Sequence, residues 1–316
     1  MLERQPKRRM RQDSSAGSAV MRGLIKHSAA LLALLLLLCG CGEPAQPETE
    51  TETARSKTAA GTELEVCCFS AGKADAFLLY TEGGAVLIDC GEKGFGKEIL
   101  AYMEAEKIES LDYLIVTHFD KDHVGGAAKI LNSVPVGTVL QSNCPKDSEA
   151  YEKYLKALSS ASIEPVTVRE TLTFALDGVR YTVDPPRKDN YASDDSNNSS
   201  LIVSVQNGEN DLLFTGDAQN ERLEEFISQN RTQYDFLKVP YHGHWQEKLP
   251  ELFASVRPEY AVITSSEEEP EDAETLKTLT GSGAQVWLTR EGAVALHCDG
   301  QTIAVEQIEA APGAAA

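Results

Sequence analysis

Four side chains that can bind a metal ion lie within six residues, between an apolar run and a predicted helix. Residues 117–123 read Thr-His-Phe-Asp-Lys-Asp-His and follow the apolar residues 113–116, which predict a buried strand. Two imidazoles and two carboxylates suit zinc, manganese or iron, which accept mixed nitrogen and oxygen ligands. A polar turn that caps the next helix accounts for one Asp, but not for two His and two Asp. We therefore expect a metal site on a loop at the end of a strand.

Apolar runs on both sides of this motif predict a strand-rich α/β domain. Strands are expected at residues 64–69, 76–81, 85–89, 138–141, 166–168, 172–176, 179–183, 201–205, 212–215, 236–240, 260–264, 286–288, 293–296 and 302–305. Helices are expected near residues 97–107, 127–131, 148–158, 219–230 and 273–279, and a long polar loop over 185–200. The composition does not change between these elements. One domain over residues 63–306 is expected, with two sheets packed together and covered by helices.

The first 41 residues have the composition of an export signal. Seven Lys and Arg side chains precede the apolar run 29–38, which is short for a transmembrane helix and has the length of a signal-peptide core. Residues 38–41, Leu-Cys-Gly-Cys, resemble a bacterial lipobox. The resemblance implies that Cys41 is acylated, with Cys39 as the alternative, and that the protein is anchored to the cell membrane on its extracytoplasmic side. Alternatively, the segment could remain as an uncleaved membrane anchor, which would also place the remaining chain outside the cytoplasm. Translation could also start at Met21, because residues 21–41 alone form a complete signal peptide.

The segments that flank the domain have no apolar periodicity. Residues 42–62 are rich in Glu, Thr, Pro and Ala and predict a disordered acidic tether, and residues 307–316 predict a flexible tail. The formal net charge of the chain is −20, and residues 1–40 contribute seven basic but only two acidic side chains. A strongly acidic domain repels polyanions over a Debye length of about 8 Å, so the charge does not favour strong nucleic-acid binding.

The cysteines do not have the spacing of a zinc ribbon. Five lie in the predicted domain, an odd number without a CxxC pair, at positions 67, 68, 90, 144 and 298. Buried free thiols are expected, and no disulfide can be assigned. Cys67 and Cys68 would point to opposite faces of a strand, so at most one of them is expected to face the core.

Two more potential ligands follow predicted strands. Asp217 comes after residues 212–215, and His242 comes after residues 236–240. Taken alone, Asp217 could be a helix N-cap and His242 a hydrogen-bonded loop histidine. Their shared position, at strand ends where sites gather, favours a common function with the 118–123 motif.

Together these segments resemble the metallo-β-lactamase superfamily. The resemblance runs over about residues 64–305 and rests on residues 118–123, on Thr-Gly-Asp at 215–217 and on Val-Pro-Tyr-His-Gly at 239–243. Within the superfamily, the chain is most similar to the C-terminal hydrolase domain of the ComEC competence proteins and their stand-alone relatives. Those proteins have H-x-D-x-D-H where classical β-lactamases have H-x-H-x-D-H, and Asp120 occupies the exchanged position. The resemblance implies an αββα four-layer sandwich, with two mixed sheets flanked by helices.

The resemblance also implies ligands for one or two divalent ions, either zinc or manganese. The implied ligands are His118, Asp120, Asp122, His123, Asp217 and His242. His118 and Asp120 would hold the first ion, and Asp122, His123 and His242 would hold the second. Asp217 would bridge the two ions. Asp122 and Asp217 would also act in catalysis.

Five further residues are predicted to support the ions or to contact the substrate. Asn197 and Asn198 occupy the stretch where many relatives place another metal-binding His, which leaves the first site poor in ligands. Lys73 and Asp75 match a family loop near the first hairpin, where Lys73 would contact an anionic substrate and Asp75 would support the metal shell; both could equally be ordinary turn residues. His244 could be a spare ligand, a proton donor or a surface residue, and we favour a supporting role.

We therefore expect a surface-anchored, metal-dependent hydrolase that cleaves a small or polymeric phosphoester by metal-activated hydroxide. One alternative is a ComEC-like DNA nuclease linked to competence and DNA uptake, which the acidic charge disfavours. A β-lactamase is disfavoured by the incomplete first site. A non-catalytic surface lipoprotein that keeps the fold for binding is disfavoured by the near-complete ligand set.

Overall fold

The structure is a computed structural model, and it describes residues 61–192 and 195–308 of the chain. The predicted signal peptide, its acylation site Cys41 and nearly all of the predicted tether lie outside the described residues. All described residues belong to one compact unit. Thr62, the last residue of the predicted tether, is held on the domain, because it donates hydrogen bonds to Asn207 Oδ1 (3.0 Å) and to the Asp177 carbonyl (2.7 Å). Its last strand ends at Ile308, two residues past the predicted boundary. No helix in the described part of the chain has the length and apolar character needed to cross a membrane.

The described strands form two sheets. The first has eight strands in the order β15-β14-β1-β2-β3-β4-β5-β6. Their bounds are β1 Leu64–Cys68, β2 Phe77–Thr81, β3 Gly84–Ile88, β4 Leu111–Val116, β5 Val136–Gln141, β6 Val166–Thr167, β14 Ala293–Cys298 and β15 Ile303–Ile308. The second has seven strands in the order β13-β12-β11-β10-β9-β8-β7. Their bounds are β7 Leu172–Leu176, β8 Val179–Asp184, β9 Ile202–Asn207, β10 Asn210–Phe214, β11 Phe236–Lys238, β12 Tyr260–Ile263 and β13 Gln285–Leu288.

Both sheets are mixed. In the first, β1, β2 and β3 pair antiparallel, whereas β3 to β6 run parallel. In the second, β7 to β10 pair antiparallel, whereas β10 to β13 run parallel. Parallel strands end at the same edge of a sheet, so the residues that follow β10 and β11 are brought together.

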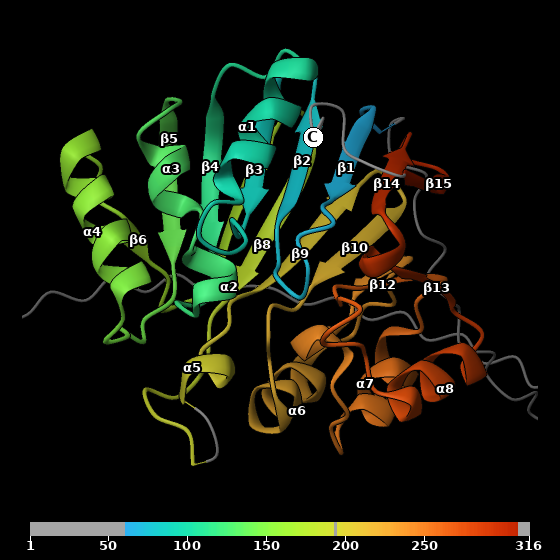
Figure 1. Cartoon of the computed structure of the whole chain (residues 1–316). Helices are drawn as coiled ribbons and strands as arrows, with labels where there is room; N and C mark the ends of the chain where they lie inside the picture. The colour runs from blue at the N-terminus through green and yellow to red at the C-terminus, as the bar shows by residue number, and fades with distance from the viewer. Residues whose placement is uncertain (1–60, 193–194, 309–316) are drawn as a thin grey trace, which may run out of the picture. The chain divides into compact units, whose positions relative to one another are not determined.

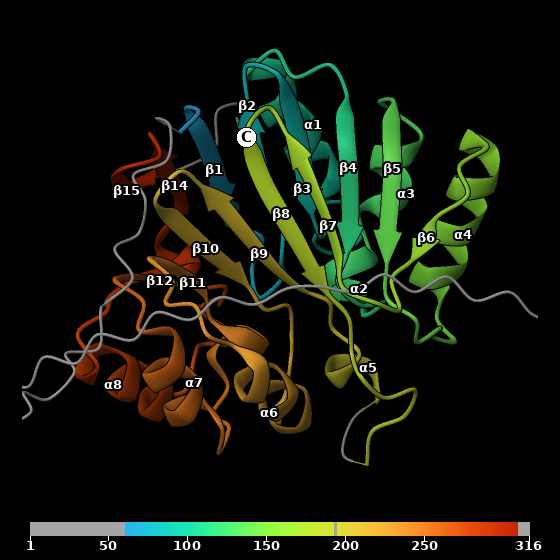
Figure 2. The same ribbon diagram turned by 180° about the vertical axis from the view of Figure 1, so that it is seen from behind.

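Helices cover the outer face of each sheet. On the first sheet lie α1 Gly96–Ala105, α3 Ala127–Leu131 and α4 Glu149–Ala161, whose apolar side chains pack in one buried cluster with those of β2 to β5. On the second lie α6 Asn220–Gln229, α7 Leu249–Val256 and α8 Ala273–Gly281. Figure 1 shows the first group of helices in front of β2 to β5, and Figure 2 shows β7 to β10 from behind. The predicted αββα sandwich of two mixed sheets flanked by helices is confirmed.

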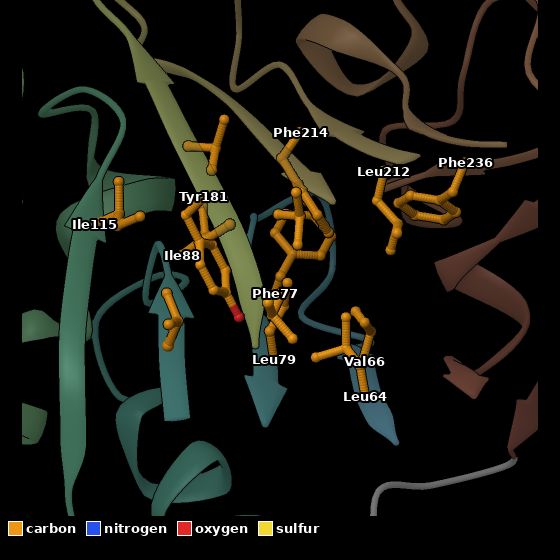
Figure 3. Close-up of a cluster of buried hydrophobic side chains, with 14 of the residues drawn as sticks. Leu64, Val66, Phe77, Leu79, Ile88, Ile115, Tyr181, Leu212, Phe214 and Phe236 are labelled. Carbon is orange, nitrogen blue, oxygen red and sulfur yellow. The ribbon is translucent and has the colours of Figure 1, made fainter. Parts of the chain in front are cut away.

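The core between the sheets follows the two-residue period of the strands. Leu64 and Val66 of β1 and Phe77 and Leu79 of β2 belong to one buried cluster with Phe214 of β10, whose ring lies next to that of Phe77 (Figure 3). Residues of the opposite parity point outward under the helices. Cys67 and Cys68 point to opposite faces of β1, as predicted, but both faces are covered. Both side chains are therefore fully buried, and the expectation that at most one faces the core was wrong. None of the five described cysteines forms a disulfide, and four of them are buried as predicted, whereas Cys144 is partly exposed.

Two local predictions were corrected. The polar segment predicted as a loop over 185–200 contains a short helix, α5 Asp195–Asn198. The 118–123 motif is not entirely a loop, because α2 Lys121–Val124 starts inside it and carries Asp122 and His123. Helix α2 has only a single turn, between strand β4 and the two glycines at 125 and 126, and was too short to give a periodic hydrophobic signal.

Removing Phe214 should test the importance of the core between the sheets. Its ring lies 5.3 Å from that of Phe77 and 5.5 Å from that of Phe236, measured between centroids. Phe214→Ala is expected to lower the free energy of unfolding by about 3–5 kcal/mol through lost burial and a cavity. Leu155→Ala, at a side chain that is 42% exposed, should change it by less than about 0.5 kcal/mol in the same urea titration. Equal effects would contradict this assignment of the core.

Candidate metal centre

Three segments from the two sheets deliver the candidate ligands to one place. The first sheet contributes His118, at the end of β4, and Asp122 and His123 on α2. The second contributes Asp217 just after β10 and His242 in the 3-10 turn η1 Pro240–Gly243 after β11. Figure 1 shows α2 at the carboxyl end of β4.

The side chains converge on one carboxylate oxygen. Asp217 Oδ2 lies 2.9 Å from His242 Nε2, 3.2 Å from His123 Nε2 and 4.0 Å from His118 Nε2. Asp122 Oδ2 lies 3.5 Å from His242 Nε2. The three imidazoles and Asp217 are almost completely inaccessible to solvent. The structure therefore brings together five of the six predicted ligands in a buried cluster.

Hydrogen bonds at Nδ1 set the orientation of all three imidazoles. His123 Nδ1 lies 2.8 Å from Asp89 Oδ2, a carboxylate that can only accept. The Thr117 hydroxyl donates to Asp89 (2.7 Å), so it accepts from His118 Nδ1 (3.1 Å). Each Nδ1 that faces such an acceptor carries a proton.

The same logic holds on the second sheet. The Thr264 hydroxyl donates to Asp75 Oδ1 (2.7 Å) and accepts from His242 Nδ1 (3.0 Å). Nδ1 is therefore the protonated nitrogen in all three rings, and Nε2 is the one that can offer a lone pair. None of the three Nε2 atoms makes a well-directed hydrogen bond with the described residues. This pattern, with Nδ1 held by a carboxylate or hydroxyl and Nε2 directed at a common point, is typical of metal-ligating histidines.

The electrostatics of the centre couple its carboxylates to its imidazoles. Burial alone would raise the pKa of Asp217, but His242, His123 and Lys238 hold it well below its usual range. Burial alone would lower the pKa of His123, but Asp217 and Asp89 raise it well above its usual value. Asp217 likewise raises the pKa of His242, whereas burial and the neighbouring His123 lower the pKa of His118. Without a metal ion, protons on His123 and His242 therefore balance the carboxylates. A divalent cation would replace those protons.

The residues present fit a divalent ion. Asp122, His123, Asp217 and His242 each offer a ligand atom, and these atoms all lie within 4.8 Å of one another. Ligands at about 2.0–2.2 Å around a tetrahedral ion lie about 3.3–3.6 Å apart, close to the contacts of 2.9, 3.2 and 3.5 Å seen here. A second group, Asp75, Asp89 and His123, is also close together. The oxygen atoms of Asp75 and Asp89 already contact the imidazoles, the threonine hydroxyls and Lys238, so this second group supports the group formed by Asp122, His123, Asp217 and His242.

The residues expected at a first ion are arranged more loosely. His118 Nε2 lies 3.9 Å from Asp120 Oδ1. Asp120 accepts hydrogen bonds at that oxygen from Lys146 Nζ and from Ser196 Oγ. Asp120 also lies farther out than the other predicted ligands, with a side chain that is 25% exposed.

The five predicted supporting residues have different positions. Lys73 Nζ lies 3.6 Å from Asp122 Oδ2, and Asp75 contacts Lys238 and Thr264 behind the imidazoles. Asn197 and Asn198 are buried; Asn198 Oδ1 accepts the backbone N–H of Arg222 (3.1 Å) and thereby holds the start of α6. His244 lies 3.9 Å from Asp272 and is not among the clustered ligands.

The sequence alone did not single out several residues that complete the centre. They are Asp89, Thr117, Lys146, Ser196, Lys238 and Thr264. Lys238 gave a usable signal, because it is a lone charged residue in the apolar strand β11, and a fully buried Lys requires a partner. Its ammonium contacts Asp75 and lies 2.9 Å from the Gly216 carbonyl and 3.5 Å from Asp217 Oδ1. Asp89 also gave a usable signal, because it directly follows the buried strand β3, just as His118, Asp217 and His242 follow strands.

The backbone at His242 is strained. Tyr241 and His242 have φ values of 50° and 53°, in the left-handed region that non-glycine residues rarely adopt. Each such residue costs roughly 1 kcal/mol or more and persists only where the surroundings fix it. Here the strain turns the His242 ring toward Asp217.

Metal binding should release protons. Because Asp217 raises the pKa of His123 and of His242 in the metal-free protein, both rings hold protons that the ion must displace. Affinity is therefore expected to rise with pH, by up to about tenfold per pH unit for each proton released, until the rings are neutral without metal. Titration calorimetry with Mn²⁺ or Zn²⁺ at pH 6 and pH 8, in buffers of different ionisation enthalpy, measures both effects. An affinity independent of pH would contradict the proton balance described above.

Comparison with known proteins identifies the family of the chain. A model of the metallo-beta-lactamase superfamily matches residues 70–265. The chain is 28% identical over 211 residues to Recombination protein 2 of Haemophilus influenzae and 28% identical over 230 residues to ComE operon protein 3 of Bacillus subtilis. Each alignment covers 65% of this chain but only 25% and 28%, respectively, of those longer relatives. Among solved structures, the metallo-beta-lactamase fold protein YhfI of Bacillus subtilis aligns with a TM-score of 0.48 and 12% identity, over 71% of this chain and 96% of that one. The chain belongs to the metallo-β-lactamase superfamily, and its matched curated relatives are related to ComEC.

Proposed function

We propose that this protein is a metal-dependent hydrolase of phosphodiesters or related esters. The observation that carries the proposal is the set of three buried imidazoles whose Nε2 atoms converge on one carboxylate oxygen, that of Asp217, without a well-directed hydrogen bond to the described residues. A purely structural cluster would satisfy these nitrogens within the protein. Lys73 and Lys146 lie at the more exposed side of the cluster, where they would face an anionic substrate.

The residues divide the catalytic tasks among them. Asp122, His123, Asp217 and His242 would hold the ion, with His118 beside them. A divalent cation held there acts as a Lewis acid and supplies hydroxide at neutral pH. Asp122 is the ligand nearest to solvent, at 11% side-chain exposure, which suits it to orient the attacking water. Lys73, at 3.6 Å from Asp122, is placed to bind a phosphoryl oxygen.

A DNA substrate is the second candidate. One matched relative is named for recombination, and DNA is a polymeric phosphodiester. The formal charge of −20 weighs against strong binding to DNA away from the centre. Hydrolysis of a small phosphodiester without single-stranded DNA cleavage would favour the first candidate, and the reverse result the second.

The N-terminal sequence supports an extracytoplasmic, lipid-anchored location. The basic residues, the apolar run 29–38 and Cys41 are in the order that an acylated export signal requires. Under this proposal the tether places the hydrolase domain next to the membrane surface.

Two substitutions test the hydrolase assignment. Asp217→Asn and His242→Ala each remove a ligand, and each is expected to lower kcat/KM for bis-p-nitrophenyl phosphate by about 10³-fold with Mn²⁺ or Zn²⁺ present. Asp299→Asn and His297→Ala are the matched controls. Both residues lie at the far end of the first sheet, in contact with Thr302 and Glu65, and their substitution should leave turnover unchanged. Equal turnover by the wild type and the two ligand variants would overturn the assignment.

Acylation is tested separately. Cys41→Ala is expected to abolish labelling of the protein by radioactive palmitate in the bacterial host and to release it from the membrane fraction. Cys39→Ala should retain both properties. Loss of labelling with Cys39→Ala alone would move the acceptor to Cys39.

A further inference from the structure

A lysine occupies the outer side of the centre, where a second ion would be expected. Lys146 Nζ contacts Asp120 Oδ1 and lies 3.1 Å from Ser196 Oγ, which itself donates to the same carboxylate oxygen. Asp120 precedes α2, Lys146 lies in the loop after β5 and Ser196 is on α5. Three separate segments thus combine a carboxylate, an ammonium and a hydroxyl beside His118.

While Lys146 holds Asp120, the donors that remain beside His118 are too few for a second tightly bound ion. His118 Nε2 is 3.9 Å from Asp120 Oδ1 and 4.0 Å from Asp217 Oδ2, and that Asp217 oxygen is already the shared atom of the inner group. Asn198 Oδ1 is turned toward the start of α6, where it accepts the Arg222 N–H. A structural or catalytic zinc ion needs at least three protein ligands.

The ammonium of Lys146 also opposes a second cation directly. Like charges at close range repel strongly where water is partly excluded, and Asp120 is only 25% exposed. The Asp120 oxygen nearest to His118 is the one that Lys146 and Ser196 already use. A metal ion at this oxygen would have to displace the lysine.

We propose that Lys146 supplies the second positive charge of the centre, so that the chain holds one divalent ion and an ammonium in place of a second ion. The resident ion binds at Asp122, His123, Asp217 and His242. Lys146 neutralises Asp120 and remains close enough to the centre to stabilise an anionic oxygen of the substrate. The inference rests on the metal centre of the proposed function, but not on the phosphodiester substrate.

Metal stoichiometry tests the proposal without measuring activity. The whole 316-residue chain is stripped with a chelator, titrated with Mn²⁺ in a calorimeter and analysed for bound metal by mass spectrometry. The wild type is expected to bind one ion per chain. Lys146→Met is expected to bind two, the second about 10- to 100-fold more weakly than the first, because Asp120 is then free to join His118 and Asp217.

Two further variants separate charge from structure. Lys146→Arg keeps the positive charge and should still bind one ion. Lys153→Met removes a lysine of α4 that pairs with Glu149 rather than Asp120, and it should also bind one ion. Thermal unfolding followed by circular dichroism confirms that each variant is folded.

Two results would overturn the proposal. One is a wild-type chain that binds two ions of similar affinity, which needs no variant at all. The other is a folded Lys146→Met variant that still binds only one. Absence of phosphodiester turnover would remove the proposed substrate but would leave the stoichiometry unchanged, so the two failures can be distinguished.

Discussion

The metal centre depends on a carboxylate that is kept buried between two sheets. Asp217 is almost fully inaccessible to solvent, and an isolated carboxylate in such surroundings would take up a proton rather than stay ionised. It stays ionised because His242, His123 and Lys238 surround it with positive charge. Removing one partner of a buried pair leaves an uncompensated charge, and this is commonly worth about 3–5 kcal/mol. Each ligand therefore affects folding as well as metal binding.

The same network ties the two sheets together at the end where the site lies. Asp75, which precedes β2 of the first sheet, contacts Lys238 of β11 and accepts the Thr264 hydroxyl after β12. The backbone also crosses here, since the Leu201 N–H donates to the Thr117 carbonyl (3.0 Å). Asp75 thus holds His242 through Thr264 and Asp217 through Lys238. The geometry of the centre is set by how the sheets pack, and a bound ion would stabilise that packing in return.

Periodic patterns predicted most of the strands and helices, and the resemblance to the metallo-β-lactamase superfamily implied the four-layer sandwich and the set of candidate ligands. A His or Asp that follows a predicted strand can be recognised in the sequence alone, as at His118, Asp217 and His242. The residues that contact these side chains cannot be recognised in this way, because Thr264 and Lys146 act through partners that are distant in the sequence. Thr264 is 189 residues from Asp75, and nothing near it in the sequence indicates an imidazole partner. The short helix α2 was missed because a single helical turn is too short to show a hydrophobic period.

The exposure of the ligands indicates how an anion could reach the centre of so acidic a chain. The side chains of His118, His123 and His242 are fully buried and that of Asp217 is 4% exposed, whereas those of Asp120, Lys73 and Lys146 are 25%, 23% and 36% exposed. The centre therefore opens toward solvent on the side of Asp120 and Asp122, and each of these carboxylates is paired with a lysine. Because charges at partly buried positions interact more strongly than charges on the surface, these two ammonium groups contribute more to the potential at this side of the centre than the distant surface charges do. The acidic surface would then act mainly on large polyanions, which extend beyond the two lysines, and much less on a small phosphoester.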